Sequence, residues 1–325
     1  MTFSSRHLLD VDELTVEEIG RVMSMAEVFQ DVSTRVVLRG AHVALLFAEP
    51  STRTRLSFEI AARRLGGETY VLEPSSSSMV KGETLVDTVR NLDALGFRFV
   101  IVRHHRAGAA AVAARYFSGS VVNAGDGWHA HPTQALLDLF TLRRHFGGSA
   151  GGGSVGGADA LKGRKVAIVG DVLHSRVARS NVWTLTKSGA TVYLCGPREW
   201  VRGLESLPAM LTDDLNTALR DADAVMGLRV QKERMARGVS LGAYIDRYQV
   251  TEERLSRLAP SAPYLHPGPI NEGVETTREV ARGPRSLVLE QARNGVPVRM
   301  AVLAALAGAT GVPSEMEREL VRTNT

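Results

Sequence analysis

The sequence predicts an α/β protein of two doubly wound parallel-sheet domains, with the active site in the cleft between them. Apolar, strand-like runs alternate with helical patterns along the first 146 residues, and a second alternation of this kind begins at residue 165. Between them, the glycine-rich stretch 147–157 has the composition of a flexible linker or surface loop. Sheets of this class bind ligands at the carboxyl ends of their strands.

The first alternation predicts four strands and five helices. The strands are Val43–Phe47, Thr69–Leu72, Phe99–Val102 and Val121–Asn123. The helices are Leu14–Phe29, Leu56–Leu65, Thr84–Leu95, Ala107–Tyr116 and Pro132–His145. Thr15 is expected to cap the first helix, since Glu17 and Glu18 stand in its first turn.

The second alternation predicts the strands of the other domain. They are Lys165–Asp171, Thr191–Leu194, Ala224–Leu228 and Pro263–Leu265. An Ala/Leu-rich helix is predicted over Val298–Ala309. We therefore expect domains over residues 1–146 and 147–289, with a C-terminal helical segment of about 290–325 that packs back on the first domain.

Composition restricts the class of protein. The 325 residues are 44% hydrophobic and carry a formal charge of +4, a mild positive balance that suits acidic ligands. Cys195 is the only cysteine, so an internal disulfide is excluded, and its apolar neighbours predict a buried strand. We expect a cytoplasmic protein that binds neither membrane nor nucleic acid, because no apolar run reaches the length of a membrane helix, residues 1–12 lack a signal core, and no basic run is interleaved with aromatics.

Five residues combine three hydroxyl groups with two guanidinium groups: Ser51, Thr52, Arg53, Thr54 and Arg55. They follow a predicted strand and precede a helical pattern. Hydroxyls and unpaired backbone N–H groups at a helix start form an anion site, and arginines match phosphate or carboxylate oxygens. No Gly-Lys-Ser/Thr is present, so this is not a Walker loop. The alternative is an ordinary capped helix with exposed arginines.

His131 and Gln134 lie three apart at a predicted helix start, where both side chains can donate to one carbonyl oxygen. His129 with His131 imitates a metal pair, but we expect no metal. Gly170-Asp171 ends a predicted strand without the further glycines of a dinucleotide fingerprint, so we expect no cofactor.

Arginines recur after predicted strands in both halves, at Arg103, Arg176 and Arg229. A serine-rich loop over 75–84 contains Lys81. We find no Gly-x-Ser-x-Gly, no cysteine with an evident base and no paired acids at glycosidase-like spacing. These features favour a reaction between two anionic substrates, in which the protein orients, neutralises and desolvates them.

Five motifs in register resemble the aspartate/ornithine carbamoyltransferase family over nearly the whole chain. They are Ser51–Arg55, Lys81–Thr84, His131–Gln134, Arg229–Arg234 and His266–Pro269. These motifs favour the aspartate branch of the family. The serine-rich loop ends in Lys-Gly-Glu-Thr, as in aspartate enzymes. Residues 266–269 contain no cysteine, whereas ornithine enzymes carry a motif similar to His-Cys-Leu-Pro there. The glycine at 268, where many members have leucine, is a departure that leaves the backbone carbonyl in place.

The resemblance implies an enzyme that transfers the carbamoyl group of carbamoyl phosphate to L-aspartate, giving N-carbamoyl-L-aspartate and phosphate in de novo pyrimidine (UMP) synthesis. A carbamoyltransferase for another amine acceptor, such as ornithine, is the alternative, and a catalytically silent homologue is a third hypothesis. The family resemblance also implies a homotrimer with shared active sites. A regulatory or dihydroorotase-like partner is left open.

Site residues follow from the same resemblance. The expected carbamoyl phosphate ligands are Ser51, Thr52, Arg53, Thr54, Ser77, Arg103, His131, Gln134, Gly268 and Pro269. The expected aspartate ligands are Lys81, Arg176, Arg229 and Gln231. Catalytic roles are implied for Arg53, Thr54, Lys81, Arg103 and His131, and the loop with Ser77 and Lys81 is expected to come from a neighbouring subunit.

Overall fold

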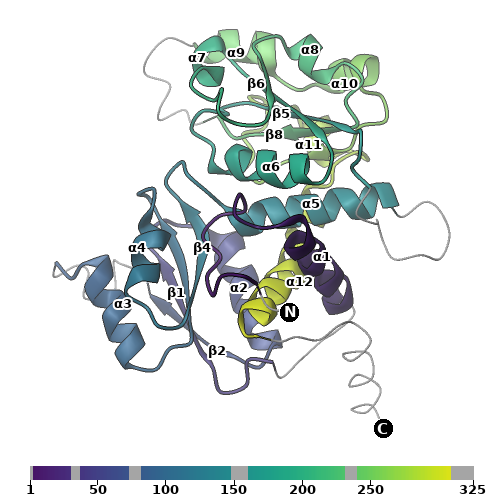
Figure 1. The fold of residues 1–325 in the computed structure, drawn as a ribbon. Coiled ribbons are helices and arrows are strands. Elements are labelled where there is room, and N and C mark those ends of the chain that lie inside the picture. The colour runs from purple at the N-terminus through teal and green to yellow at the C-terminus, as the bar shows by residue number, and fades with distance from the viewer. Residues whose placement is uncertain (1–2, 31–36, 73–81, 148–159, 231–239, 309–325) are drawn as a thin grey trace. The chain divides into compact units, whose positions relative to one another are not determined.

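The structure is a computed structural model that describes residues 3–30, 37–72, 82–147, 160–230 and 240–308. The described chain forms two compact units, each with its own parallel sheet (Figure 1). Unit 1 comprises residues 1–136 and 294–325, and unit 2 comprises residues 137–293. The predicted α/β class with two parallel-sheet domains is confirmed, while the domain limits given above stay a prediction.

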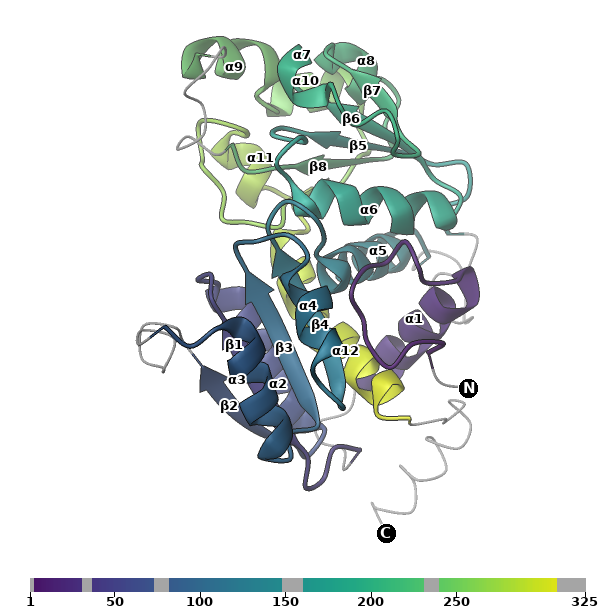
Figure 2. The ribbon, with the colours of Figure 1, turned by 60° about the vertical axis from the view of Figure 1, so that its left-hand side comes forward.

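Unit 1 is built on a four-stranded sheet of order β2-β1-β3-β4. Its strands are β1 (His42–Phe47), β2 (Glu68–Leu72), β3 (Phe99–His104) and β4 (Ser120–Asp126). All pairs are parallel, with Leu45 opposite Ile101 at the centre. The interiors of β1, β3 and β4 are buried and rich in β-branched residues, because helices cover both faces (Figure 2). The four predicted strands are therefore confirmed.

The helices of this part of the chain match their predicted places. They are α1 (Val16–Gln30), α2 (Thr52–Arg64), α3 (Leu85–Ala94), α4 (Ala109–Arg115) and α5 (Pro132–Gly147). Thr15 caps α1 as expected: its Oγ1 accepts from the N–H of Glu18 (3.2 Å), and the Glu18 carboxylate accepts from the N–H of Thr15 (2.9 Å). Side chains of α3 and α4 form one apolar cluster with β1, β3 and β4.

Unit 2 has a five-stranded parallel sheet of order β7-β6-β5-β8-β9. Its strands are β5 (Lys165–Val169), β6 (Thr191–Cys195), β7 (Met210–Thr212), β8 (Ala224–Gly227) and β9 (Tyr264–Leu265). The helices are α6 (Arg176–Lys187), α7 (Arg198–Val201), α8 (Leu215–Leu219), α9 (Leu241–Tyr248), α10 (Glu252–Leu258) and α11 (Arg278–Arg282). Side chains of α7 to α10 share one buried cluster with the sheet.

Two predictions were incomplete. The short strand β7 and the helices α7 to α11 were not predicted. The helix predicted over Val298–Ala309 starts too late, because α12 spans Val288–Leu306 and continues through Pro297. A proline within a helix usually marks its start or end, which makes the true amino end of α12 hard to see in the sequence.

Cys195 ends β6 and is fully buried, as predicted. Burial, with the charges of Asp214 and Asp213 in support, raises the pKa of its thiol to about 12.

The thiolate is the reactive form of a cysteine, so the folded protein is expected to resist a thiol reagent such as 5,5′-dithiobis(2-nitrobenzoate) at pH 8. One thiol per chain is expected to react after unfolding in urea. Stoichiometric labelling within minutes without denaturant would contradict this burial.

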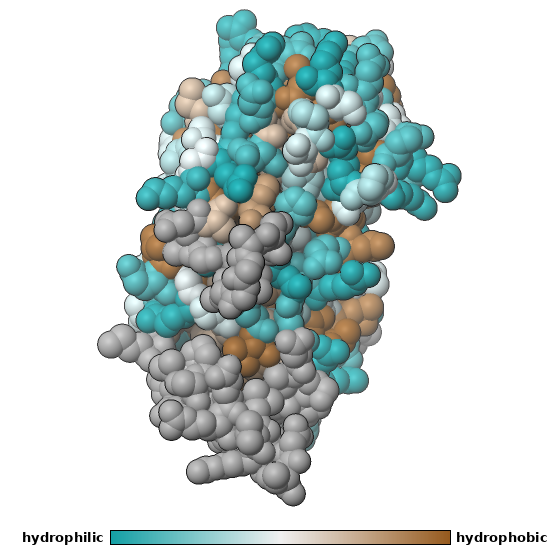
Figure 3. All heavy atoms as spheres, turned by 90° about the vertical axis from the view of Figure 1, so that its right-hand side faces the viewer, coloured by the Kyte–Doolittle hydropathy of each residue, from teal (hydrophilic) through white to brown (hydrophobic). Residues whose placement is uncertain are grey.

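Among the described residues, no helix is long and apolar enough to cross a bilayer. The face in Figure 3 is mostly hydrophilic where its residues are described, with hydrophobic side chains scattered among polar ones. Such scattering is usual for a protein surface in contact with water.

Candidate active site

The segment Ser51–Arg55 forms the start of α2, one turn earlier than the sequence pattern predicted. Ser51 occupies the N-cap position in an extended conformation (φ −162°, ψ 100°), but its side chain makes no capping hydrogen bond. The first N–H groups of a helix have no partner within the helix, and the helix dipole favours an anion there. Ser51, Thr52 and the backbone of this turn therefore present the chemistry of an anion site.

Within this turn, Arg53 is exposed, whereas the Thr54 side chain is 6% exposed and lies in the first turn of α2. Desolvation by surrounding atoms lowers the pKa of Arg53, yet a guanidinium stays charged at any physiological pH. The turn thus offers a permanent cation beside a buried hydroxyl.

Arg103 lies near the carboxyl end of β3, next to β1 in the sheet. Its Nη1 donates to the carbonyl oxygen of Ala124 (3.0 Å), and its Nη2 lies 3.5 Å from Oε1 of Glu49. Its side chain is only 11% exposed. These contacts fix the guanidinium at the carboxyl edge of the sheet, close to the chain that leads into α2.

His131 directly precedes α5, and Gln134 lies in its first turn. Both side chains are buried, 4% and 8% exposed, and the Gln134 N–H donates to the carbonyl oxygen of His131 (3.0 Å). The two residues therefore lie together at a helix start, as predicted from their spacing. They follow β4, so unit 1 brings its candidate residues to the ends of three adjoining strands, β1, β3 and β4.

Asp126 anchors the loop that leads to His131, a function that sequence reasoning missed. Its carboxylate accepts from the N–H of Gly108 (2.6 Å), the N–H of Ala130 (3.1 Å) and Nδ2 of Asn123 (2.8 Å). Nδ1 of His129 lies 3.2 Å away, and this hydrogen bond raises the pKa of His129. The sequence feature that could have indicated this function is the acidic residue within the stretch from Asn123 to Gly127.

Asp10 also contacts His129, because its Oδ2 lies 3.6 Å from Nε2 of that ring. Burial, aided by the charges of Asp12 and Asp126, raises its pKa to about 6, although the Val11 N–H and His129 act in the opposite direction. The folded state therefore binds the Asp10 proton more tightly than the unfolded chain does, and the stability from this proton is lost as pH rises through 6.

Replacing Asp10 by asparagine removes this titration. We expect the melting temperature of Asp10→Asn, relative to wild type, to be a few degrees higher at pH 8 than at pH 5, because the substitution removes an ionisation cost of roughly 3 kcal/mol at pH 8 but only about half of that at pH 5. Differential scanning fluorimetry at both pH values measures the difference. The matched control is Glu13→Gln in the adjacent exposed turn. An equal offset at both pH values would contradict the raised pKa.

Unit 2 presents a second group of cations. Arg176 opens α6, whose N-cap Ser175 accepts from the N–H of Ala178 (3.1 Å). Asp171 follows β5, and its Oδ1 lies 2.8 Å from Nδ1 of His174 in the same loop. Arg229 follows β8, the strand beside β5. Both arginines are half-buried.

Gly268 and Pro269 follow β9, the next strand in the sheet. Gly268 has a positive φ of 67°, and its bond to Pro269 is cis. A positive φ favours glycine over residues that carry a side chain. Unit 2 thus brings Arg176, Arg229 and the Gly268 backbone to the ends of three adjoining strands. Ser77, Lys81 and Gln231 lie outside the described residues.

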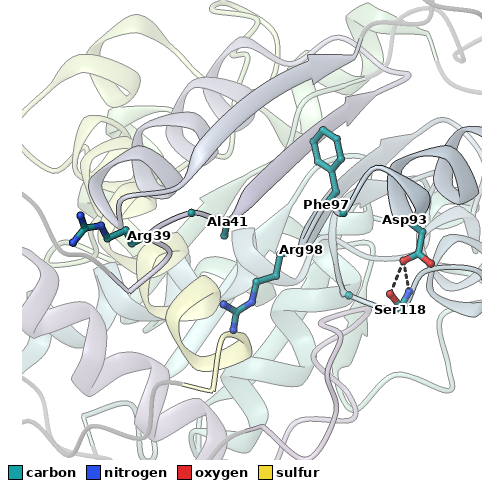
Figure 4. Close-up of a pocket in the computed structure, with 9 residues that line it drawn as sticks. Arg39, Ala41, Asp93, Phe97, Arg98 and Ser118 are labelled. Carbon is teal, nitrogen blue, oxygen red and sulfur yellow. Dashed lines mark hydrogen bonds between the residues drawn. The ribbon is translucent and has the colours of Figure 1, made fainter.

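A cavity of about 410 Å³ opens in unit 1, at the amino ends of the strands of its sheet (Figure 4). Its lining includes Arg39, Ala41, Asp93, Phe97, Arg98 and Ser118. Asp93 accepts hydrogen bonds from the N–H and the hydroxyl of Ser118. Parallel sheets bind substrates at the carboxyl ends of their strands, whereas this cavity lies at the amino ends of β1, β3 and β4. We therefore do not assign it to the candidate site.

Comparison with known proteins identifies the two halves of the chain. Residues 6–144 match the carbamoyl-P binding domain of aspartate/ornithine carbamoyltransferases, and residues 162–306 match the Asp/Orn binding domain. The chain belongs to the aspartate/ornithine carbamoyltransferase family. The resemblance seen in the motifs is therefore confirmed, and the chain belongs to a family of transferases.

Relatives in this family support the aspartate branch. The aspartate carbamoyltransferase catalytic subunit of Roseiflexus sp. (strain RS-1) is 46% identical over 316 residues, which cover 93% of this chain and 95% of that protein. Among solved structures, the catalytic subunit of M. jannaschii aspartate transcarbamoylase is 31% identical, with a TM-score of 0.78 over 94% of this chain and 99% of that one. Ornithine carbamoyltransferase from Thermus thermophilus has a TM-score of 0.81 and 32% identity, over 93% and 99%. The fold is thus common to both branches of the carbamoyltransferase family.

Proposed function

We propose that this carbamoyltransferase transfers the carbamoyl group of carbamoyl phosphate to the amine of L-aspartate, giving N-carbamoyl-L-aspartate and phosphate for pyrimidine synthesis in the cytoplasm. The observation that carries the acceptor assignment is the 46% identity to a relative named for aspartate, over 95% of that relative. Arg176 and Arg229 support it, because a dicarboxylate acceptor needs cations that the side-chain ammonium of ornithine would not favour.

In this proposal the α2 start holds the phosphate. Ser51, Thr52 and Thr54 offer hydroxyl and backbone donors, and Arg53 neutralises the charge that grows on the leaving phosphate. The aspartate amine attacks the carbamoyl carbon, the C–O bond to phosphate breaks, and the departing phosphate accepts the amine proton. No protein base is needed for this step.

The carbamoyl oxygen gains negative charge during the attack. Thr54, Arg103 and His131 donate to it, and His131 acts as a donor rather than as a base. Gln134 and the backbone carbonyls near Gly268 and Pro269 hold the carbamoyl amide. Arg176, Arg229 and Gln231 bind the two carboxylates of aspartate, and Lys81 contacts both substrates.

We also propose a homotrimer in which a neighbouring chain contributes Ser77 and Lys81. Support comes from exposed apolar side chains on unit 1: Leu56 and Ile60, one turn apart on α2, are 45% and 42% exposed, and Tyr70 and Val71 on the edge strand β2 are each 42% exposed. Leu56 and Ile60 share one face of α2 and form a small apolar patch that another chain would cover in this proposal. Mixing inactive Arg53→Ala and Lys81→Ala chains after dissociation is expected to restore activity, since some sites then receive both native residues.

The experiment that tests the function offers carbamoyl phosphate with L-aspartate or with L-ornithine to the purified chain. Carbamoyl-aspartate without citrulline supports the proposal. Citrulline would move the assignment to the ornithine alternative. A well-folded oligomer that forms neither product would favour the catalytically silent homologue.

A further inference from the structure

The loop after β9 contains a buried histidine whose proton position the structure defines. Nδ1 of His266 accepts a hydrogen bond from the N–H of Gly268 (2.8 Å). A nitrogen that accepts carries no proton, so the neutral ring has its proton on Nε2. This tautomer is assigned from the direction of the hydrogen bond.

Nε2 of His266 faces a carboxyl group. It lies 3.4 Å from Oε1 of Glu275, and both side chains are fully buried. The same Oε1 accepts a hydrogen bond from the N–H of Asn271 (2.6 Å). Glu275 therefore holds the loop 266–271 at two points, through the ring near its start and through the backbone at its end.

Asn271 extends this contact toward the aspartate ligands. Its Nδ2 donates to the carbonyl oxygen of Val230 (3.2 Å), which follows Arg229 in the chain. By fixing the Asn271 backbone, Glu275 thus orders both the loop with Gly268 and the segment that carries Arg229.

The start of the loop is fixed independently. The N–H of His266 donates to Oε1 of Gln291 (2.8 Å), and Nε2 of Gln291 donates to Oδ1 of Asp138 (2.7 Å). The other carboxylate oxygen of Asp138 accepts from Nδ2 of Asn181 (2.9 Å). All four side chains are buried. The backbone of His266 is therefore held in place, so a change at Glu275 acts mainly on the ring and on the rest of the loop.

The ring itself has little room. A Cβ added to Gly227, the last residue of β8, would lie 3.1 Å from Cδ2 of His266 and would collide with the hydroxyl of Tyr264. The absence of a side chain at Gly227 therefore lets the ring pack close to β8, with Nε2 toward Glu275.

We infer that Glu275 is a positioning residue for carbamoyl transfer. Through the hydrogen bond from the N–H of Asn271 and the 3.4 Å contact of its carboxylate with Nε2 of His266, it holds the loop so that the backbone carbonyls near Gly268 and Pro269 face the carbamoyl amide. Glu275 itself touches no substrate. The inference rests on the proposed function for its catalytic consequence, but the geometry that it asserts is testable without substrate.

The first experiment measures the tautomer of His266 in the full chain labelled with ¹⁵N-histidine. Long-range ¹H–¹⁵N spectra at pH 7.5 are expected to show a protonated Nε2 and an unprotonated Nδ1, with the signals assigned by their loss in His266→Gln. A proton on Nδ1, or a doubly protonated ring, would overturn the inference. The tautomer can be measured even if the chain is inactive with aspartate. A failure of this inference can therefore be distinguished from a failure of the proposed function.

The second experiment measures turnover. Glu275→Ala is expected to lower kcat by about 10–100-fold, as for other lost supports of site groups, while the KM for aspartate changes by less than roughly threefold. Glu275→Gln keeps an amide oxygen that can accept from the N–H of Asn271 and lie beside Nε2 of His266, so it is expected to recover most of the lost turnover. The matched control is Glu272→Gln, whose exposed carboxylate pairs with Arg282 (2.6 Å) in the same segment.

Two outcomes contradict the inference. One is wild-type kcat in a folded Glu275→Ala protein. The other is a Glu275→Gln protein with a kcat as low as that of Glu275→Ala. That result would mean that turnover depends on the negative charge of Glu275 rather than on the position of its acceptor oxygen. If Glu275→Ala does not fold, the Gln variant and the tautomer measurement still decide the matter.

Discussion

Arg53→Ala is expected to lower kcat for carbamoyl transfer by about 10²-fold or more, the usual loss when a donor to developing charge is removed. Arg53 lies in the first turn of α2, where the helix dipole and N–H groups already favour an anion. In the transition state, negative charge moves onto the leaving phosphate, so the guanidinium stabilises that state more than the bound substrate. Steady-state rates with both substrates saturating measure the effect.

The matched control for this prediction is Arg63→Ala, near the other end of the same helix. Arg63 is largely exposed and pairs with Glu59 at 2.7 Å, one turn earlier. Its loss is expected to leave kcat within about twofold, since exposed ion pairs contribute little. Arg53→Lys separates charge from geometry, because lysine keeps the charge but not the planar fork, and it is expected to fall between wild type and Arg53→Ala. Near-normal turnover in Arg53→Ala would remove the role proposed for this residue.

Gly170→Ala is expected to destabilise unit 2 by roughly 3–5 kcal/mol and to lower its melting temperature by about 10 °C. Gly170 follows β5 with φ +136°, a conformation that side chains strongly disfavour. An added Cβ would lie 2.6 Å from the carbonyl oxygen of Leu228 and 3.0 Å from its Cβ. Because Leu228 precedes Arg229, the displacement is also expected to raise the KM for aspartate.

Gly242→Ala is the control in the same unit. Gly242 lies in α9 with ordinary φ, and an added Cβ would meet no atom within 4 Å. Alanine is the better helix former, so this variant is expected to melt at or slightly above the wild-type temperature. Circular dichroism melts of both variants provide the comparison. Equal melting temperatures for the two would show that the backbone at Gly170 relaxes without cost.

The sequence predicted the central strands of the sheets well because these strands are buried on both faces. Phe99–Val102 reads as a continuous apolar run, and such a run between turn residues has few alternatives in an α/β chain. The short helices of unit 2 escaped prediction for the opposite reason. Helices such as Leu215–Leu219 have barely more than one turn, so they carry no periodicity, and their stability comes from packing on the sheet.

For the site, sequence motifs located the residues that end strands or begin helices, such as Arg103 and His131. They could not reveal the side chains that hold them. Glu49 and Asp126 are ordinary acids in the sequence, and their function appears only when folding brings Glu49 to Arg103 and Asp126 to the His131 loop. The match of a buried acceptor to a distant donor depends on tertiary structure, which no local pattern encodes.

The hydrogen bonds that close each unit join distant parts of the chain, and this has a consequence for protein synthesis. Oδ1 of Asn294 accepts from Gln30 in unit 1 across 264 positions, and Asp138 accepts from Gln291 in unit 2 across 153. At 5–20 residues per second, the ribosome needs on the order of tens of seconds to make the later partner after the earlier one. Throughout that interval each unit lacks these contacts, so neither reaches its finished state before Gln291 and Asn294 have been made. Because contacts of such long sequence separation form slowly, we expect the final folding step of each unit to be late and slow.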